Sequence, residues 1–150
     1  MVRISELEEY AKEYNIPIML EDGIEFLCDY IKKHNIKRIL EIGTAIGYSA
    51  IKMASIDKDI KITTIERDKD RYSLALKNIS DFKLEEQINV ILDDALNVDL
   101  SDKYDLIFID AAKGQYINFF EKFKTNLNNN GVIISDNLSF HGLVEGDWST

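Results

Sequence analysis

The sequence contains one cysteine and one proline, and it has no hydrophobic run long enough to cross a membrane. Because Cys28 is alone, an internal disulfide is excluded, and its place on an apolar helical stripe favours a small buried side chain over a nucleophile. The acidic residue Glu6 lies too close to the N-terminus for the first residues to be expected to form a secretion signal. With no linker-like segment and 45% hydrophobic residues, residues 1–150 are predicted to form one cytoplasmic domain with a single core.

Basic residues are also scarce. Lysine and arginine number 18 against 27 aspartates and glutamates, which gives a net charge of −9. A surface of this sign repels a phosphate backbone, so broad, non-specific nucleic-acid binding is not expected. Recognition of one extruded base by a small site remains compatible with this charge.

Two amphipathic helices are expected first, followed by alternating strands and helices. Ser5 and Glu8 form a capping-box pattern that opens the first helix, Pro17 ends it, and the second helix is expected over residues 21–34. The later elements are expected to be strands at 38–42, 60–65, 88–92, 104–110 and 132–135, helices at 48–55, after Asp68 and at 115–127, and a turn at 128–131. This alternation predicts an α/β fold, a doubly wound, mostly parallel sheet with helices on both faces.

Glycines separate the first expected strand from the next helix. Gly43 and Gly47 form Gly-x-x-x-Gly, not the Gly-x-Gly-x-x-Gly of dinucleotide sites, which favours a nucleoside ligand without phosphates. Glu66 ends the second strand, where a carboxylate can accept ribose hydroxyls, and Asp94 and Ala95 follow the third strand, near an adenine edge. Each of these features alone has a simpler explanation. The glycines can occur by chance, Glu66 can be a solvated charge, and Asp94 can be a turn residue. Together, at successive strand ends, they indicate a nucleoside cofactor.

Three oxygen-bearing side chains follow two other expected strands. Asp110 ends the strand at 104–110, and Asp136 and Asn137 follow the strand at 132–135. The carboxyl ends of parallel strands meet at one edge, so these groups are expected to lie together, and two carboxylates with one amide suit a hard divalent cation. Helix capping by the aspartates and turn formation by Asn137 are simpler explanations of each residue alone. The repetition at both strand ends favours a metal site.

Five segments, in this order, resemble the cation-dependent, S-adenosylmethionine-using O-methyltransferases, which include catechol and caffeoyl-coenzyme A methyltransferases. They are residues 40–49, 64–67, 94–95, 108–113 and 135–137. The resemblance covers about residues 14–145 and implies the Rossmann-like methyltransferase fold. Residues 16–19 and 110–116 are most similar to the bacterial branch that methylates 5-hydroxyuridine at the tRNA wobble position.

The resemblance also implies roles for single residues, with S-adenosylmethionine as cofactor and Mg²⁺, or another divalent cation, as metal. The implied cofactor-binding residues are Met19, Gly43, Ser49, Glu66, Asp94, Ala95 and Asp110, and the implied metal ligands are Asp110, Asp136 and Asn137. Lys113 is implied to assist deprotonation of the acceptor. A metal ion and a proton acceptor agree with the chemistry of methyl transfer to a hydroxyl. A phenol-like hydroxyl is mostly protonated at neutral pH, and a divalent cation on its oxygen promotes ionisation.

An acceptor with two adjacent oxygens could chelate such a cation. The resemblance favours the tRNA anticodon, with 5-hydroxyuridine converted to 5-methoxyuridine, and a small catechol-like molecule is the alternative. A non-catalytic S-adenosylmethionine-binding module and a nicotinamide dehydrogenase are alternatives from other classes. The dehydrogenase should show Gly-x-Gly-x-x-Gly and leaves Asp136 and Asn137 without a role.

The sequence departs from the family at both ends. Family members usually begin with another helix and end with two further strands, whereas this sequence ends at Thr150 in an expected loop. The apolar strand at 132–135 would then lie at an unprotected edge. We therefore expect a chain truncated at its C-terminus, lacking the last strands of the family, or a partner such as a second copy that covers this edge.

Overall fold

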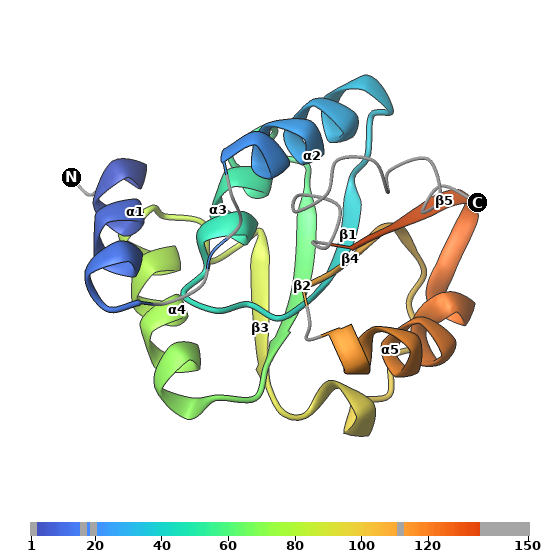
Figure 1. Cartoon of the computed structure of the whole chain (residues 1–150). Coiled ribbons are helices and arrows are strands. Elements are labelled where there is room, and N and C mark those ends of the chain that lie inside the picture. The colour runs from blue at the N-terminus through green and yellow to red at the C-terminus, as the bar shows by residue number, and fades with distance from the viewer. Residues whose placement is uncertain (1–2, 16–17, 19–20, 111–112, 136–150) are drawn as a thin grey trace.

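The fold is a five-stranded parallel sheet with helices on both faces (Figure 1). The computed structural model describes residues 3–15, 18, 21–110 and 113–135. The sheet order is β3-β2-β1-β4-β5, and all neighbouring strands are parallel. Its elements are α1 (Ile4–Glu13), α2 (Glu21–Lys33), β1 (Arg38–Ile42), α3 (Tyr48–Ala54), β2 (Lys61–Glu66), α4 (Lys69–Asp81), β3 (Ile88–Leu92), η1 (Ala95–Asn97), β4 (Tyr104–Ile109), η2 (Lys113–Gln115), α5 (Tyr116–Phe123), η3 (Lys124–Asn126) and β5 (Leu127–Ser135). This arrangement confirms the predicted doubly wound α/β fold.

Alternate residues of each strand enter different layers, because successive side chains of a strand point to opposite faces. Ile39 and Leu106 join the core that the sheet shares with α1, α2, α3 and α4. Leu40 and Ile107 join the core on the opposite face, with α5 and η1. Since the connections change face between β1 and β4, their carboxyl ends lie at a topological switch point, where open α/β sheets form a crevice.

The predicted capping box at the first helix is wrong. Helix α1 begins at Ile4, with Arg3 as its N-cap and no side-chain capping bond, so Ser5 lies inside the helix. The Glu8 carboxylate has a tertiary partner instead, because the Tyr48 hydroxyl of α3 donates to Glu8 Oε2 at 2.7 Å. The local pattern was overridden by a contact between helices.

The predicted turn at residues 128–131 and the long helix before it are also corrected. The α-helix ends at Phe123, η3 follows, and β5 begins at Leu127, so these residues lie inside the strand. Asn130 keeps a left-handed conformation with φ of 68°, as a turn residue would, but it does so in an irregular part of the strand. Gly131 and its neighbours are therefore accommodated by a bulge in the β4–β5 pairing.

Other boundaries follow the sequence closely. The strands at 38–42 and 88–92 are found as predicted, β2 begins and ends one residue later, and β4 ends one residue earlier. The Asp68 cap of α4 is confirmed, since its side chain accepts bonds from the backbone N–H groups of Asp70 and Arg71. Asp and Asn cap helices well because their short side chains reach these free N–H groups.

Cys28 is half-buried against the core shared with α1 to α4. Burial raises the pKa of its thiol, which disfavours the thiolate form. This agrees with a packing role. Among the helices that the structure describes, none is long and apolar enough to span a membrane.

Candidate functional site

A cleft of about 330 Å³ opens at the carboxyl ends of the central strands. Its walls come from the ends of β1 and β2, from residues that follow each of the strands β1 to β4, and from α4, η2 and α5. The lining residues are Ile42, Gly43, Ile65, Glu66, Arg67, Arg71, Asp93, Asp94, Ala95, Leu96, Asp110, Gln115 and Phe119. Five predicted site residues, Gly43, Glu66, Asp94, Ala95 and Asp110, thus share one cavity, although they are spread over much of the sequence.

Gly43 lies where the end of β1 passes close to the end of β4. Its φ is +101°, and a Cβ at this position would lie 2.4 Å from the backbone oxygen of Asp110. No L side chain fits without moving the backbone, so glycine is required here both by conformation and by space. The close approach places the Gly43 backbone in the wall of the cleft beside Asp110.

We expect Gly43→Ala to lower the free energy of unfolding by about 1–3 kcal/mol, because the variant combines a strained backbone with a steric clash. Urea denaturation of both proteins would measure the difference. Gly114→Ala is the matched control, because an added Cβ there has no atom within 4 Å. Equal loss of stability in the two variants would contradict the account of Gly43.

Glu66 is a nearly buried carboxylate in the wall of the cleft, with 7% of the residue exposed. The backbone N–H of Ala45 donates to its Oε1 at 2.7 Å, and that of Asp68 donates to its Oε2 at 3.0 Å. These bonds hold the carboxylate in place. Each oxygen retains a further lone pair, so the group can still accept hydrogen bonds from two ligand hydroxyls.

A buried polar network lies behind the loop between β1 and α3. The Glu41 carboxylate accepts bonds from the Ser49 hydroxyl and, at 2.6 Å, from the Thr64 hydroxyl. Because Thr64 gives its only hydroxyl proton to Glu41, the 2.7 Å contact between Thr44 and Thr64 must have Thr44 as donor. Four buried side chains from β1, the loop, α3 and β2 thus fix one loop conformation.

The structure places Ser49 in this network and not among the residues that line the cleft. Its predicted contact with the methionine portion of a cofactor stays a prediction. Glu41 lies within the segment 40–49 that carries the family resemblance, but no role was predicted for it. The available signal was an acidic residue at an otherwise apolar strand end.

Asp94 and Ala95, which are predicted to lie near an adenine, line the cleft beyond β3. The Asp94 side chain also caps η1 by accepting a bond from the backbone N–H of Leu96 at 3.0 Å. Asp94 is therefore both a turn residue and a residue of the cleft. Capping fixes the side chain at the rim of the cavity.

Asp110 lies in the cleft directly after β4, and its backbone N–H donates to Ile42 O at 2.9 Å. Met19, Asp136 and Asn137 lie outside the described residues, as does the side chain of Lys113, whose backbone belongs to η2. Within the described part of the chain, no group of three metal-binding side chains occurs. The predicted set of two carboxylates and one amide nevertheless has the oxygen chemistry that suits Mg²⁺.

Several cleft residues were missed. Arg67 directly follows Glu66, and Arg71 lies in the first turn of α4, so both place cationic groups near the predicted ribose site. Gln115 and Phe119 come from the segment between β4 and β5. Their place over the cleft depends on how that crossover packs, for which the sequence offered no local signal.

The fold and the cleft define a doubly wound α/β protein with a small-molecule site at its switch point. A family model described as O-methyltransferase matches residues 3–149. The chain therefore belongs to the O-methyltransferase family, of the type that includes the caffeoyl-CoA and catechol enzymes. This confirms the family resemblance, while the closer likeness to the tRNA-modifying branch stays a prediction.

Individual relatives agree with this assignment. The chain is 33% identical over 108 residues to a caffeoyl-CoA O-methyltransferase of Stellaria longipes, covering 65% of this chain and 44% of that protein. It is 34% identical over 115 residues to a catechol O-methyltransferase of Niastella koreensis, covering 71% of this chain and 52% of the relative. The match thus spans about half the length of these two relatives.

A solved structure of an O-methyltransferase from Bacillus cereus in complex with SAH superposes with a TM-score of 0.82 at 27% identity, covering 98% of this chain and 71% of that one. A candidate caffeoyl-CoA O-methyltransferase from Staphylococcus aureus superposes with a TM-score of 0.86 at 40% identity, covering 96% and 70%. Both comparisons support the Rossmann-like methyltransferase fold.

Proposed function

We propose that this chain supplies the cofactor site of an S-adenosylmethionine- and Mg²⁺-dependent O-methyltransferase. The observation that carries the proposal is the convergence of Gly43, Glu66, Asp94 and Asp110 on one cleft at the switch point. The Bacillus cereus relative was solved with SAH, the product form of this cofactor. A cleft of about 330 Å³ lies in the range of small-molecule sites.

The nucleoside end of the cofactor would lie against β2 and β3. Glu66 is already held by two backbone N–H groups, so its remaining lone pairs would accept bonds from the ribose hydroxyls with little cost of reordering. Asp94 and Ala95 would border the adenine. Asp110, beside Gly43, would lie near the amino-acid end of the cofactor, because both residues line the other wall.

The metal would be held by Asp110, Asp136 and Asn137. The register supports this proposal, because Ile109 lies opposite Ser135 in the β4–β5 pairing, and these residues immediately precede Asp110 and Asp136 in sequence. A divalent cation, when bound, lowers the pKa of a substrate hydroxyl that contacts it. Lys113, which follows β4 by only a few residues, would receive the proton or stabilise the developing negative charge.

Methyl transfer requires the acceptor oxygen to lie in line with the bond between the sulfur and the methyl group. The chain would contribute to this alignment by holding the cofactor against side chains and a loop that hydrogen bonds already fix. The network of Glu41, Ser49, Thr44 and Thr64 fixes the loop between β1 and α3, and the backbone N–H groups of Ala45 and Asp68 fix the Glu66 carboxylate. The main contribution of the described residues is therefore positioning.

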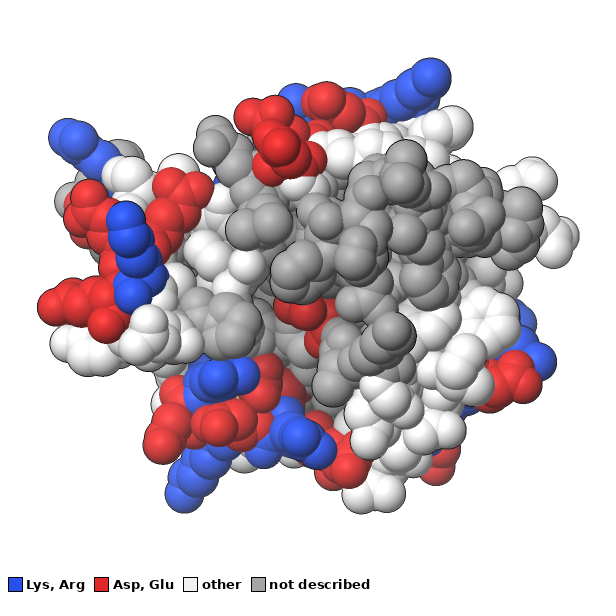
Figure 2. Space-filling view, in the orientation of Figure 1, with Lys and Arg blue, Asp and Glu red and all other residues white. Residues whose placement is uncertain are grey.

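The proposed acceptor is a molecule that presents two adjacent oxygens to the cation. Our first candidate is 5-hydroxyuridine at the tRNA wobble position, supported by the motifs at residues 16–19 and 110–116. A small catechol is the second candidate, and two observations favour it. Relatives include caffeoyl-CoA and catechol O-methyltransferases, and the described part of the face in Figure 2 has no broad basic surface for RNA.

Calorimetric titration with S-adenosylmethionine, with and without Mg²⁺, tests the cofactor proposal. Binding of NAD in its place would contradict it. The acceptor is tested by incubating the full-length protein with labelled cofactor and either tRNA containing 5-hydroxyuridine or a catechol. Label in tRNA supports the first candidate, label in the catechol supports the second, and cofactor binding without transfer to either favours a non-catalytic binding module.

A further inference from the structure

Strand β5 contains an insertion in the first part of its pairing with β4. Tyr104 lies opposite Leu127, but Leu106 lies opposite Val132, so β5 advances by five residues while β4 advances by two. The three extra residues form an irregular insertion, here called the bulge, and the pairing of the later residues of β5 starts after it. After the bulge the pairing is regular and ends with Ile109 opposite Ser135.

The backbone of the bulge has a conformation that few residues adopt. Asn130 has φ of 68°, in the left-handed region that asparagine tolerates better than most residues. A Cβ on Gly131 would lie 2.8 Å from the backbone oxygen of Asn128 and equally close to the Leu127 side chain. The backbone is therefore folded tightly on itself at this point.

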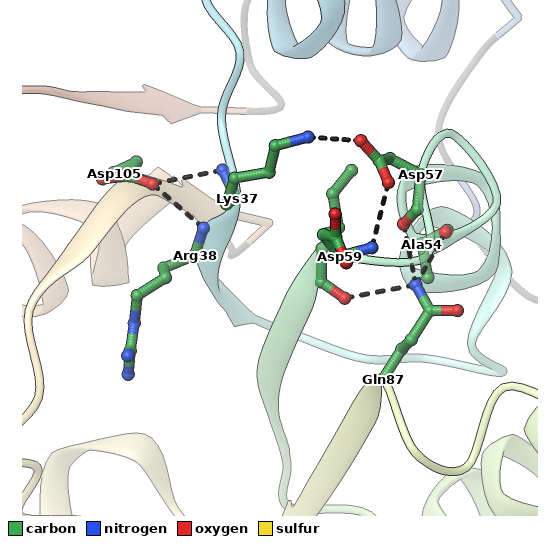
Figure 3. A network of polar contacts seen from close by, with 8 residues as sticks. Lys37, Arg38, Ala54, Asp57, Asp59, Gln87 and Asp105 are labelled. Atoms are coloured by element: carbon green, nitrogen blue, oxygen red, sulfur yellow. Dashed lines mark hydrogen bonds and ion pairs between the residues drawn. The ribbon is translucent and has the colours of Figure 1, made fainter.

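One carboxylate joins this bulge to the neighbouring strands. Asp105 Oδ1 accepts a bond from Asn128 Nδ2 at 2.9 Å, and its Oδ2 accepts bonds from the backbone N–H groups of Lys37 and Arg38 at 3.1 and 3.0 Å. Figure 3 shows the latter two bonds. Although burial alone would raise the pKa of Asp105, the bonds from Arg38, Asn128 and Lys37 lower it. Asp105 thus joins β1, β4 and β5 at the edge opposite the cleft.

We propose that Asp105 and Asn128, here called the register pair, are positioning residues for the metal site. The inference rests on the proposed function, in which Asp110 follows Ile109 and Asp136 follows Ser135 as metal ligands. A slip of one residue would shift the end of β5 by about 3.3 Å and turn its side chains to the other face. Since Mg²⁺ needs its ligands at about 2.0–2.1 Å in octahedral geometry, a slipped strand could not complete the site.

The test uses variants of the register pair in the full-length protein. Asn128→Ala removes the bond to the bulge and leaves the bonds of Asp105 to β1. Asn128→Asp places a carboxylate opposite the Asp105 carboxylate, so that two acceptors face each other without a donor, whereas the double variant Asp105→Asn with Asn128→Asp restores a donor facing an acceptor. Asn129→Ala is the matched control, because Asn129 is an exposed side chain in the same bulge.

Mn²⁺ binding, followed by electron paramagnetic resonance, is the main readout, and SAH affinity is measured in parallel. We expect Asn128→Ala and Asn128→Asp to weaken Mn²⁺ binding by about 10-fold, within the range for residues that orient metal ligands. SAH affinity should stay within about 2-fold, and the double variant should recover Mn²⁺ binding. Unchanged Mn²⁺ affinity in the single variants, or equal loss in Asn129→Ala, would overturn the inference.

Amide hydrogen exchange over residues 132–135 separates this inference from the proposed function. If the wild-type protein binds no Mn²⁺, the metal site fails. The register pair is then judged by exchange alone. Faster exchange in Asn128→Ala than in Asn129→Ala supports its role in holding β5, and equal exchange in both overturns it.

Discussion

Replacing Asp136 with alanine is expected to reduce metal-dependent methyl transfer by at least about 10²-fold, because loss of a group that merely orients a ligand already costs about 10–100-fold in metal affinity or activity. Asp136 belongs to the proposed metal set and not to the nucleoside site. The affinity for S-adenosylmethionine should therefore stay within about 2-fold of the wild-type value by calorimetry, since the hydrogen bonds of the nucleoside site are intact.

The control for this variant is Asp59→Ala, which removes an exposed carboxylate just before β2 and should leave both properties unchanged. Parallel Mn²⁺ titrations show whether the metal itself is lost. If Asp136→Ala lost cofactor affinity and transfer to the same degree, the residue would belong to the cofactor site, and the division of roles proposed above would be wrong.

Replacing Glu66 with alanine is expected to weaken S-adenosylmethionine binding by about 1–3 kcal/mol, the range for losing a charged hydrogen-bond partner. The variant removes the predicted contact with the ribose and also the bonds that fix Ala45 and Asp68. Calorimetric titration gives the change in affinity directly, and metal affinity should change much less.

Two further measurements separate the contact from the loop effect. Thermal unfolding reports how much stability is lost with the two backbone bonds, and Glu86→Ala controls for removal of an exposed glutamate. An analogue lacking both ribose hydroxyls should bind the wild-type and variant proteins with similar affinity. A dissociation constant for S-adenosylmethionine that is the same in Glu66→Ala and the wild type would remove Glu66 from the site.

The strands of this fold were predictable because their apolar runs are local and are bounded by turn residues. The strands at 38–42 and 88–92 follow the expected bounds, and Asp68 caps the following helix as predicted. Local signals failed where a distant group competed for the same atoms. Glu8 bonds Tyr48 and not the start of its own helix. Residues 128–131 form an insertion between Leu127 and Val132, which both pair with β4, and Asn128 bonds Asp105 of that strand.

The candidate site likewise contains residues that could be predicted from local sequence and residues that could not. Gly43, Glu66, Asp94 and Asp110 were recognisable because each ends or follows a strand, and parallel topology brings such positions to one edge. Arg71, Gln115 and Phe119 were missed because they reach the cleft through the packing of α4 and of the segment after β4. That packing has no signature within a short stretch of sequence.

The class of fold, the family and the strand ends that carry polar groups could be inferred without a structure, because hydrophobic periodicity and strand-end chemistry are properties of neighbouring residues. The folded arrangement was needed to show that Glu41 is held by Ser49 and Thr64, that Gly43 lies against the backbone of Asp110, and that β5 contains an insertion before its regular pairing with β4. These contacts join residues far apart in the chain, and their formation depends on how strands and helices pack together.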